Sequence, residues 1–110
     1  MSKTIFLPQN FIGKADKEKL ESFGGHTIAR GRATRWHWTN KANGDDVFEI
    51  YHGGADEELA ASVMRDREQD VFSANDGATY LIVTGALEHV MTELDRYFIR
   101  LHGELPDSFA

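Results

Sequence analysis

The most constraining feature of this sequence is an amphipathic pattern near its C-terminal end. Apolar side chains recur there at steps of three and four residues, at Leu87, Val90, Met91, Leu94, Tyr97, Phe98 and Leu101. This spacing places all of them on one face of an α-helix, and Gly103 and Pro106 are typical of residues that follow a helix end. A helix with such a face must be covered by another element, so the sequence predicts a helix over residues 87–101 that packs on a sheet.

A pair of strands is indicated in the middle of the chain. The dipeptide Asn43-Gly44 is typical of a two-residue hairpin turn, because both central positions of a type I′ turn need positive φ. A run rich in β-branched and aromatic residues precedes it at 27–40, and a second apolar run follows at 46–52. Shorter strands are expected over residues 3–7 and 78–84.

Two further helices are expected, over residues 15–23 and 56–70, the first ended by Gly24-Gly25, and a turn is expected over 73–77. The resulting order, β-α-β-β-α-β-α, resembles in its first six elements the ferredoxin-like split β-α-β unit. The prediction is a single α+β domain over residues 1–110, with an antiparallel sheet of about four strands and helices packed on one face. A three-stranded sheet with two or three helices is the alternative, if the first strand does not pair.

The predicted hairpin would have two different faces. A two-residue turn sets Trp36 opposite Tyr51 and puts both on one face with Trp38, Arg30 and Arg32. If exposed, such side chains are typical of protein-binding hot spots or of base-stacking surfaces. The same aromatic residues could instead form the core face, and a shift of one residue in the pairing would exchange the faces of one strand.

Charge is unevenly distributed along the chain, whose net charge is −6. The first forty residues carry seven cationic and three acidic side chains, whereas the remaining seventy carry five and fifteen. A surface with an acidic flank attracts basic partners, although a well-solvated surface has the same composition. The acids assigned to partner binding on this reasoning are Asp56, Glu57, Glu58, Asp66 and Asp70.

Residues that would carry a specific chemistry are sparse. The chain has no cysteine, which excludes disulfides, thiolate zinc ligands and a thiol nucleophile. His37 and His52 fall on the predicted hairpin, but Glu49 would point to its other face, so no metal or other cofactor is predicted. Phosphate-binding glycine motifs and a nucleophile elbow are also missing from the sequence. A small enzyme or ligand carrier with Arg35, His37 and His52 in a cleft is kept as an alternative.

The function that the sequence favours is a small, acidic, non-catalytic protein-binding module, acting as an inhibitor or adaptor. In one variant its acids would occupy the basic site of a nucleic-acid-handling protein. The alternative is single-stranded nucleic-acid binding by the hairpin aromatics, which the negative charge disfavours because phosphate contacts supply most of the affinity.

The sequence is compatible with self-association and indicates a location. A homodimer could form through a strand edge or through the aromatic face. No stretch reaches the roughly 20 apolar residues that a transmembrane helix needs, and the N-terminal residues lack a signal-peptide core. We therefore expect a cytoplasmic protein that does not associate with membranes.

Overall fold

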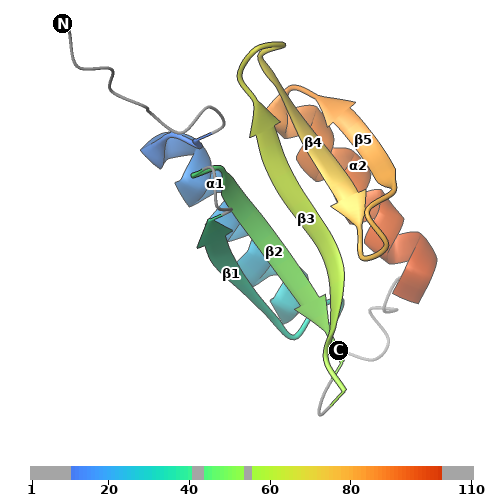
Figure 1. The fold of residues 1–110 in the computed structure, drawn as a ribbon. Helices are drawn as coiled ribbons and strands as arrows, with labels where there is room; N and C mark the ends of the chain where they lie inside the picture. The colour runs from blue at the N-terminus through green and yellow to red at the C-terminus, as the bar shows by residue number, and fades with distance from the viewer. Residues whose placement is uncertain (1–10, 41–43, 54–55, 103–110) are drawn as a thin grey trace, which may run out of the picture.

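The computed structural model of this chain describes residues 11–40, 44–53 and 56–102, which form a five-stranded antiparallel sheet and two helices (Figure 1). The strands lie in the sheet in the order in which they occur in the chain, so the first and the last are its edges. The elements are α1 Lys14–Ala29, β1 Arg35–Asn40, β2 Asp46–His52, β3 Glu58–Asp66, β4 Val71–Asp76, β5 Leu81–Gly85 and α2 Leu87–His102.

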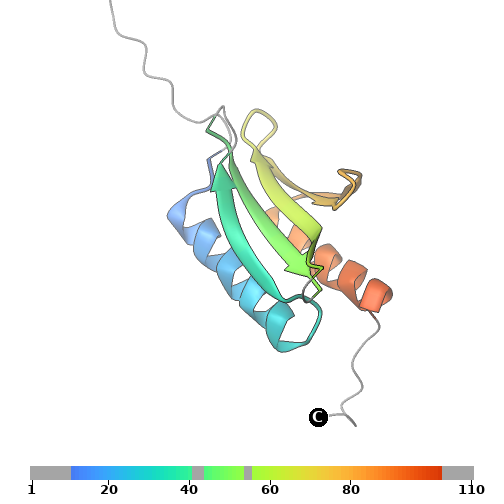
Figure 2. The ribbon, with the colours of Figure 1, turned by 60° about the horizontal axis from the view of Figure 1, so that its bottom comes forward.

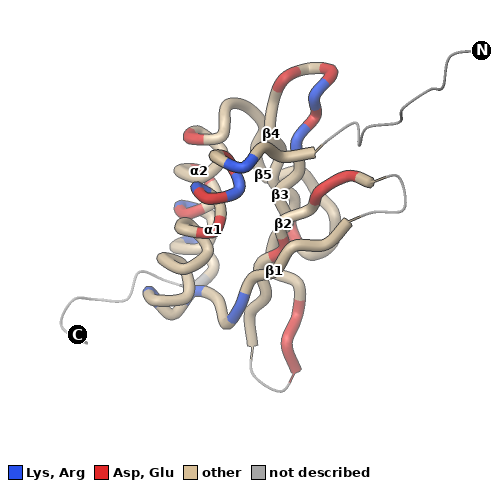
Figure 3. Tube along the Cα trace, turned by 90° about the vertical axis from the view of Figure 1, so that its left-hand side faces the viewer, with Lys and Arg blue, Asp and Glu red and all other residues tan. Residues whose placement is uncertain are grey.

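Both helices cover the same face of the sheet (Figure 3). Helix α1 lies against β1, and α2 lies against β4 and β5, so the two helices divide this face between them (Figure 2). We call the opposite side, which neither helix covers, the open face. The largest fully buried apolar side chains between the sheet and the helices are Leu20, Phe48, Ile50, Val63, Val90, Leu94 and Phe98.

The C-terminal helix is confirmed, since α2 spans Leu87–His102. Val90, Leu94 and Phe98 are completely buried against the sheet. Burial of one such side chain contributes about 1.5–3 kcal/mol, so the apolar face of α2 is a major source of stability. An antiparallel sheet with helices on one face is also observed, but with five strands rather than four.

The predicted order of elements is wrong in its details, and the observed order is α-β-β-β-β-β-α. Helix α1 continues to Ala29, so the run over 27–40 becomes a strand only from Arg35. The segment 56–70 contains β3 instead of a helix, and most of 73–77 belongs to β4. The strand expected over 3–7 lies outside the described residues.

We expected Gly24-Gly25 to end helix α1, but the helix continues through both residues. A glycine is needed at position 24 because the sheet approaches the helix closely there. A Cβ atom on Gly24 would lie 2.6 Å from Cδ1 of Trp36 and 2.9 Å from Cζ of Phe48. Gly24 therefore permits contact between α1 and the sheet, and the same residue type that weakens a helix is here needed for packing.

The acids around β3 form turns instead of a helix. The Asp66 carboxylate accepts hydrogen bonds from the backbone N–H groups of Glu68 and Gln69, at 3.0 and 3.2 Å, and Asp70 adopts a φ of 56°. These are the roles in which Asp stabilises a turn. Between the turns, Ala61 and Val63 are fully buried and their neighbours are partly exposed, which is the alternation of a strand.

The pairing of β1 with β2 differs by one residue from the expected pairing. Trp36 pairs with Ile50 and Trp38 with Phe48, and the strands end at Asn40 opposite Asp46, which leaves a connection longer than two residues. Asn43 lies outside the described residues. Trp36 and Trp38 consequently share the covered face with Phe48, at ring-centroid distances of 5.5 and 5.0 Å.

Candidate functional site

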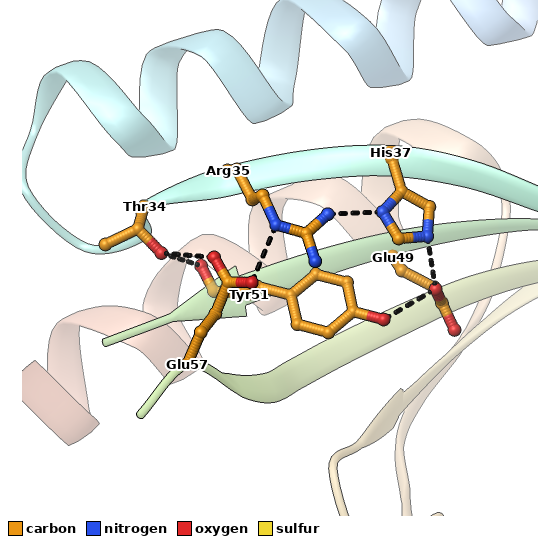
Figure 4. A network of polar contacts seen from close by, with 6 residues as sticks. All are labelled: Thr34, Arg35, His37, Glu49, Tyr51 and Glu57. Carbon is orange, nitrogen blue, oxygen red and sulfur yellow. Dashed lines mark hydrogen bonds and ion pairs between the residues drawn. The ribbon is translucent and has the colours of Figure 1, made fainter. Parts of the chain in front are cut away.

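The open face carries a hydrogen-bonded group of side chains at the β1 end of the sheet (Figure 4). Arg35 and Tyr51 are directly paired across β1 and β2, as are His37 and Glu49, so all four point to the same side. We call this group the Tyr51 cluster; its members are Thr34, Arg35, His37, Glu49, Tyr51 and Glu57.

Arg35 is held by Glu57 and by the Tyr51 ring. Its Nε donates to Oε1 of Glu57 at 2.7 Å, and its guanidinium carbon lies 4.1 Å from the centroid of the Tyr51 ring. Stacking of a guanidinium on an aromatic ring is a favourable cation–π contact. The Thr34 hydroxyl lies 3.2 Å from both the Tyr51 carbonyl oxygen and Glu57 Oε2, which fixes the carboxylate from its other side.

His37 lies between Arg35 and Glu49. Its Nε2 is 2.8 Å from Oε1 of Glu49, and its Nδ1 contacts Nη1 of Arg35. Because a guanidinium can only donate, Nδ1 accepts in this arrangement and Nε2 carries the proton. The imidazole ring also stacks on Tyr51, with centroids 5.2 Å apart. The geometry therefore assigns one tautomer and one orientation to His37.

Tyr51 completes the cluster through its hydroxyl group, which donates to Oε1 of Glu49 at 2.8 Å. Burial raises the pKa of Tyr51, and the hydrogen bond to Glu49 and the negative charge of Glu49 raise it further. The phenol consequently stays protonated at neutral pH and remains a donor. The cluster presents an ordered surface of one phenol ring, one imidazole, one guanidinium and two carboxylates.

The rest of the open face is uncharged along β4 and β5 and charged toward the β3–β4 turn. From β3 to β5 it continues into a pocket of about 890 Å³, lined by uncharged residues such as Met64, Ser73 and Asn75 and, toward the β3–β4 turn, by the charged residues Arg65, Asp66, Arg67 and Glu68. The Ser73 and Thr84 hydroxyls lie 3.2 Å apart across β4 and β5. Charged side chains return at the β3–β4 turn, where Arg65 Nη2 contacts Asp70 Oδ1 at 2.8 Å.

The predicted surface of aromatic and arginine side chains is not assembled as expected. Trp36 and Trp38 lie on the covered face, and Trp38 Nε1 donates to Glu21 Oε2 of α1 at 2.8 Å. Arg32 is 4% exposed and pairs with Asp95 at 3.0 Å, whereas Arg30 is exposed at the end of α1. The expected common face is wrong because the pairing of β1 is shifted by one residue and because Arg30 and Arg32 precede β1.

The acids assigned to partner binding lie at opposite ends of the sheet. Glu58 begins β3 and follows Asp56 and Glu57, whereas Asp66 ends β3 and precedes Asp70 in the β3–β4 turn. Asp56, Glu58 and Asp70 are exposed, Glu57 and Asp70 are paired with arginines, and Asp66 accepts backbone hydrogen bonds. They do not form one continuous acidic surface.

The charge asymmetry of the sequence is partly compensated by ion pairs within the chain. Cations from the first forty residues pair with acids from the remainder, and acidic and basic segments alternate over the molecule (Figure 3). These pairs are Lys17–Asp46 at 3.5 Å, Lys19–Glu88 at 2.8 Å, Arg32–Asp95 at 3.0 Å and Arg35–Glu57 at 2.7 Å.

The alternative cleft with Arg35, His37 and His52 is not formed. His37 belongs to the open face, whereas His52 lines a pocket of about 260 Å³ together with Tyr97 and Leu101 of α2, on the covered side. Within residues 11–40, 44–53 and 56–102, no group of three or more His, Asp or Glu side chains is placed to hold a metal ion. Neither described helix is long and apolar enough to cross a membrane.

Sequence reasoning identified Tyr51 but missed Arg35, Glu49 and Glu57 as its partners in one cluster. The signal for Glu49 was available, because a shift of one residue places it opposite His37. Glu57 comes from a segment predicted as helix, so its approach to Arg35 could not be anticipated.

Comparisons with known proteins add no relative. No protein-family model, no curated protein and no solved structure matches this chain. The class that the structure defines is an α+β domain with an antiparallel sheet covered on one face, and its function must be argued from the open face itself.

Proposed function

We propose that this protein is a non-catalytic protein-binding module that binds its partner through the Tyr51 cluster on the open face. The observation that supports this function is an ordered Tyr–Arg stack on the side of the sheet that neither helix covers. Tyrosine and arginine are among the residues most enriched in protein-binding hot spots.

The cluster is already ordered without a partner. The Arg35 side chain is 45% exposed, but Glu57 and the Tyr51 ring hold it in one position. Immobilising a long side chain on binding usually costs about 0.5–1.5 kcal/mol, and most of that cost is removed when the side chain is ordered beforehand. The cluster can thus contribute binding free energy that a mobile arginine would lose.

The charges of the cluster indicate the chemistry of the partner. The cationic Arg35 is paired with Glu57, and His37 contacts Glu49, so the cluster carries no uncompensated cation. Beyond it the open face is polar and uncharged at Ser73, Asn75 and Thr84, and it carries side chains of both charges toward the β3–β4 turn. This pattern favours a protein surface of mixed polarity over nucleic acid, and it predicts binding that depends only weakly on salt.

The test is affinity capture from lysate with the tagged full chain, with nuclease treatment and a salt series. Arg35→Ala removes the stacked guanidinium, and Arg100→Ala removes the same charge from an exposed position on α2. We expect Arg35→Ala to weaken binding of the captured protein by about tenfold or more, as hot-spot truncations do, and Arg100→Ala to leave it within about twofold.

Folding of both variants is checked by circular dichroism and thermal unfolding. Equal binding by Arg35→Ala and the unchanged protein would overturn the proposal. Binding that disappears at high salt for both variants would instead support the acidic surface around Asp56 and Glu58 as the site. Capture of nuclease-sensitive material alone would support nucleic-acid binding.

A further inference from the structure

The edge strand β5 belongs to the longest stretch of the chain without a charged residue, the eleven residues 77–87. Two of the three large apolar side chains that are strongly exposed among the described residues lie here, Tyr80 at 74% and Leu81 at 60%. Isoleucine, valine and threonine at positions 82–84 favour an extended backbone. The segment therefore has the composition of a strand suited to pairing on both of its sides.

On its outer side β5 has no neighbouring strand among the described residues, since the sheet ends there (Figure 1). Proteins usually protect such edges with lysine, proline or a covering segment, because unpaired N–H and C=O groups recruit other strands. Neither lysine nor proline occurs in 77–87. The strand is short, and its pairing with β4 shifts between Ala74 and Asn75. Both features limit aggregation through this edge, but neither of them adds a charge to it.

We propose that β5 is the pairing edge of a homodimer, in which the β5 strands of two copies pair antiparallel about a twofold axis and join their sheets. Antiparallel pairing about a twofold axis is self-complementary, so one short strand provides both halves of the interface.

Charge favours a second copy as the occupant. Each copy carries a net charge of −6, so association through most of the surface brings acids toward acids. Two copies that meet through residues 77–87 place no charged side chain of this segment opposite the same residue of the other copy, because the segment has none. An edge adapted to a charged peptide would instead carry the complementary charge.

The first measurement is the mass of the full chain by light scattering over a concentration series. We expect a concentration-dependent dimer for the unchanged protein. Leu81→Lys, at an exposed position, adds a cation to each β5 edge and removes an apolar contact, and we expect it to raise the dimer dissociation constant by about tenfold or more. A monomer at all concentrations of the unchanged protein would overturn the proposal.

A second measurement locates the contact and does not depend on weakening it. Because the chain has no cysteine, a single introduced one can form a disulfide only between two copies. Thr84→Cys on β5 is compared with Thr39→Cys on β1, the opposite edge. We expect rapid covalent dimer formation from Thr84→Cys and little from Thr39→Cys. The reverse result, or equal slow oxidation of both, would overturn the assignment of β5.

Partner capture and self-association are separable, because Arg35 and Leu81 lie on different strands at opposite edges of the sheet. A dimer that forms normally in Arg35→Ala while partner binding is lost would support both proposals. Loss of the dimer in Arg35→Ala would overturn the assignment of the β5 edge.

Discussion

The first half of the molecule, around α1 and β1, and the second half, around α2, β4 and β5, are stabilised in different ways. In the second half, α2 covers β4 and β5 with an apolar face in which Val90, Leu94 and Phe98 are completely buried. In the first half, the buried side chains of α1 are only Leu20 and Thr27, with Gly24 between them. Helix α1 is therefore held to the sheet more by close packing and polar contacts, and α2 more by apolar burial. We call the part around α1 and β1 the polar half and the part around α2, β4 and β5 the apolar half.

Polar contacts are numerous around β1. Asp46 at the start of β2 accepts from the Ile12 N–H at 2.8 Å and from Asn40 Nδ2 at 2.7 Å, and lies 3.5 Å from Lys17 Nζ. The Tyr51 cluster adds a second network on the open face. The edges follow the same division, since β1 carries Arg35 and its partners while β5 is uncharged. The polar network thus lies on β1 and its neighbours, whereas β5 is the edge that we propose to pair with a second copy.

The largest expected effect tests the apolar half. Phe98→Ala removes a fully buried ring from α2 and leaves a cavity under the sheet. Truncation of a buried phenylalanine costs about 3–5 kcal/mol, which is a large fraction of the stability of a domain of this size. Urea unfolding measures it. The exposed Arg100→Ala on the same helix is the control, with an expected change within about 0.5 kcal/mol. A loss below about 1 kcal/mol for Phe98→Ala would contradict the importance of this face.

The second prediction tests close packing in the polar half with two neighbouring glycines. A Cβ at Gly24 would lie 2.6 Å from Trp36, whereas a Cβ at Gly25 would meet nothing within 4 Å. We expect Gly24→Ala to destabilise the fold by about 1–3 kcal/mol through overpacking, and Gly25→Ala to stabilise it by about 0.5–1 kcal/mol through helix propensity. Thermal unfolding of both variants measures the difference. Equal effects would show that α1 does not approach the sheet as described.

The same difference between the halves decides how much of the fold could be predicted from the sequence. The apolar repeat from Leu87 to Leu101 directly indicates which side of α2 is buried. The bounds of that helix were predicted to within one residue. Helix α1 has no such repeat, and its glycine pair indicated an end because the need for Gly24 depends on Trp36, far along the chain. Packing between distant segments overrides local signals of this kind.

The candidate site was harder to predict than the fold class because it depends on strand pairing. A change of one residue moved Trp36 and Trp38 to the covered face and brought His37 opposite Glu49. The observed pairing matches complementary side chains, with Trp38 opposite Phe48 and His37 opposite Glu49, which is a signal that competes with the turn dipeptide. The contact of Arg35 with Glu57 additionally depends on β3 being a strand. The acids Asp56 to Glu58 are typical of a helix start, so the sequence predicted a helix there.

The smallest expected effect concerns the exposed ion pair that joins the two halves, Lys19 of α1 with Glu88 of α2, at 2.8 Å. The hydrogen bond from Lys19 lowers the pKa of Glu88 below its ordinary 4.5, helped by a backbone hydrogen bond and by the lysine charge. A lowered folded-state pKa means that the pair stabilises the fold above the unfolded pKa, and that this contribution is lost as pH falls through the folded value. Both side chains are solvent-exposed, so the effect is small.

Glu88→Gln removes this contribution, and Glu18→Gln makes the same charge change at an exposed position of α1. We expect the melting temperature of Glu88→Gln to lie slightly below that of Glu18→Gln near neutral pH, and the two to converge below the folded pKa of Glu88, where its carboxyl is protonated in the unchanged protein as well. A deficit of Glu88→Gln that persists in acid would mean that Glu88 acts through packing instead of charge. The contribution of the Lys19–Glu88 contact to stability would then be insensitive to pH. The difference between the polar and the apolar half would in that case depend only on buried polar contacts such as those of Asp46.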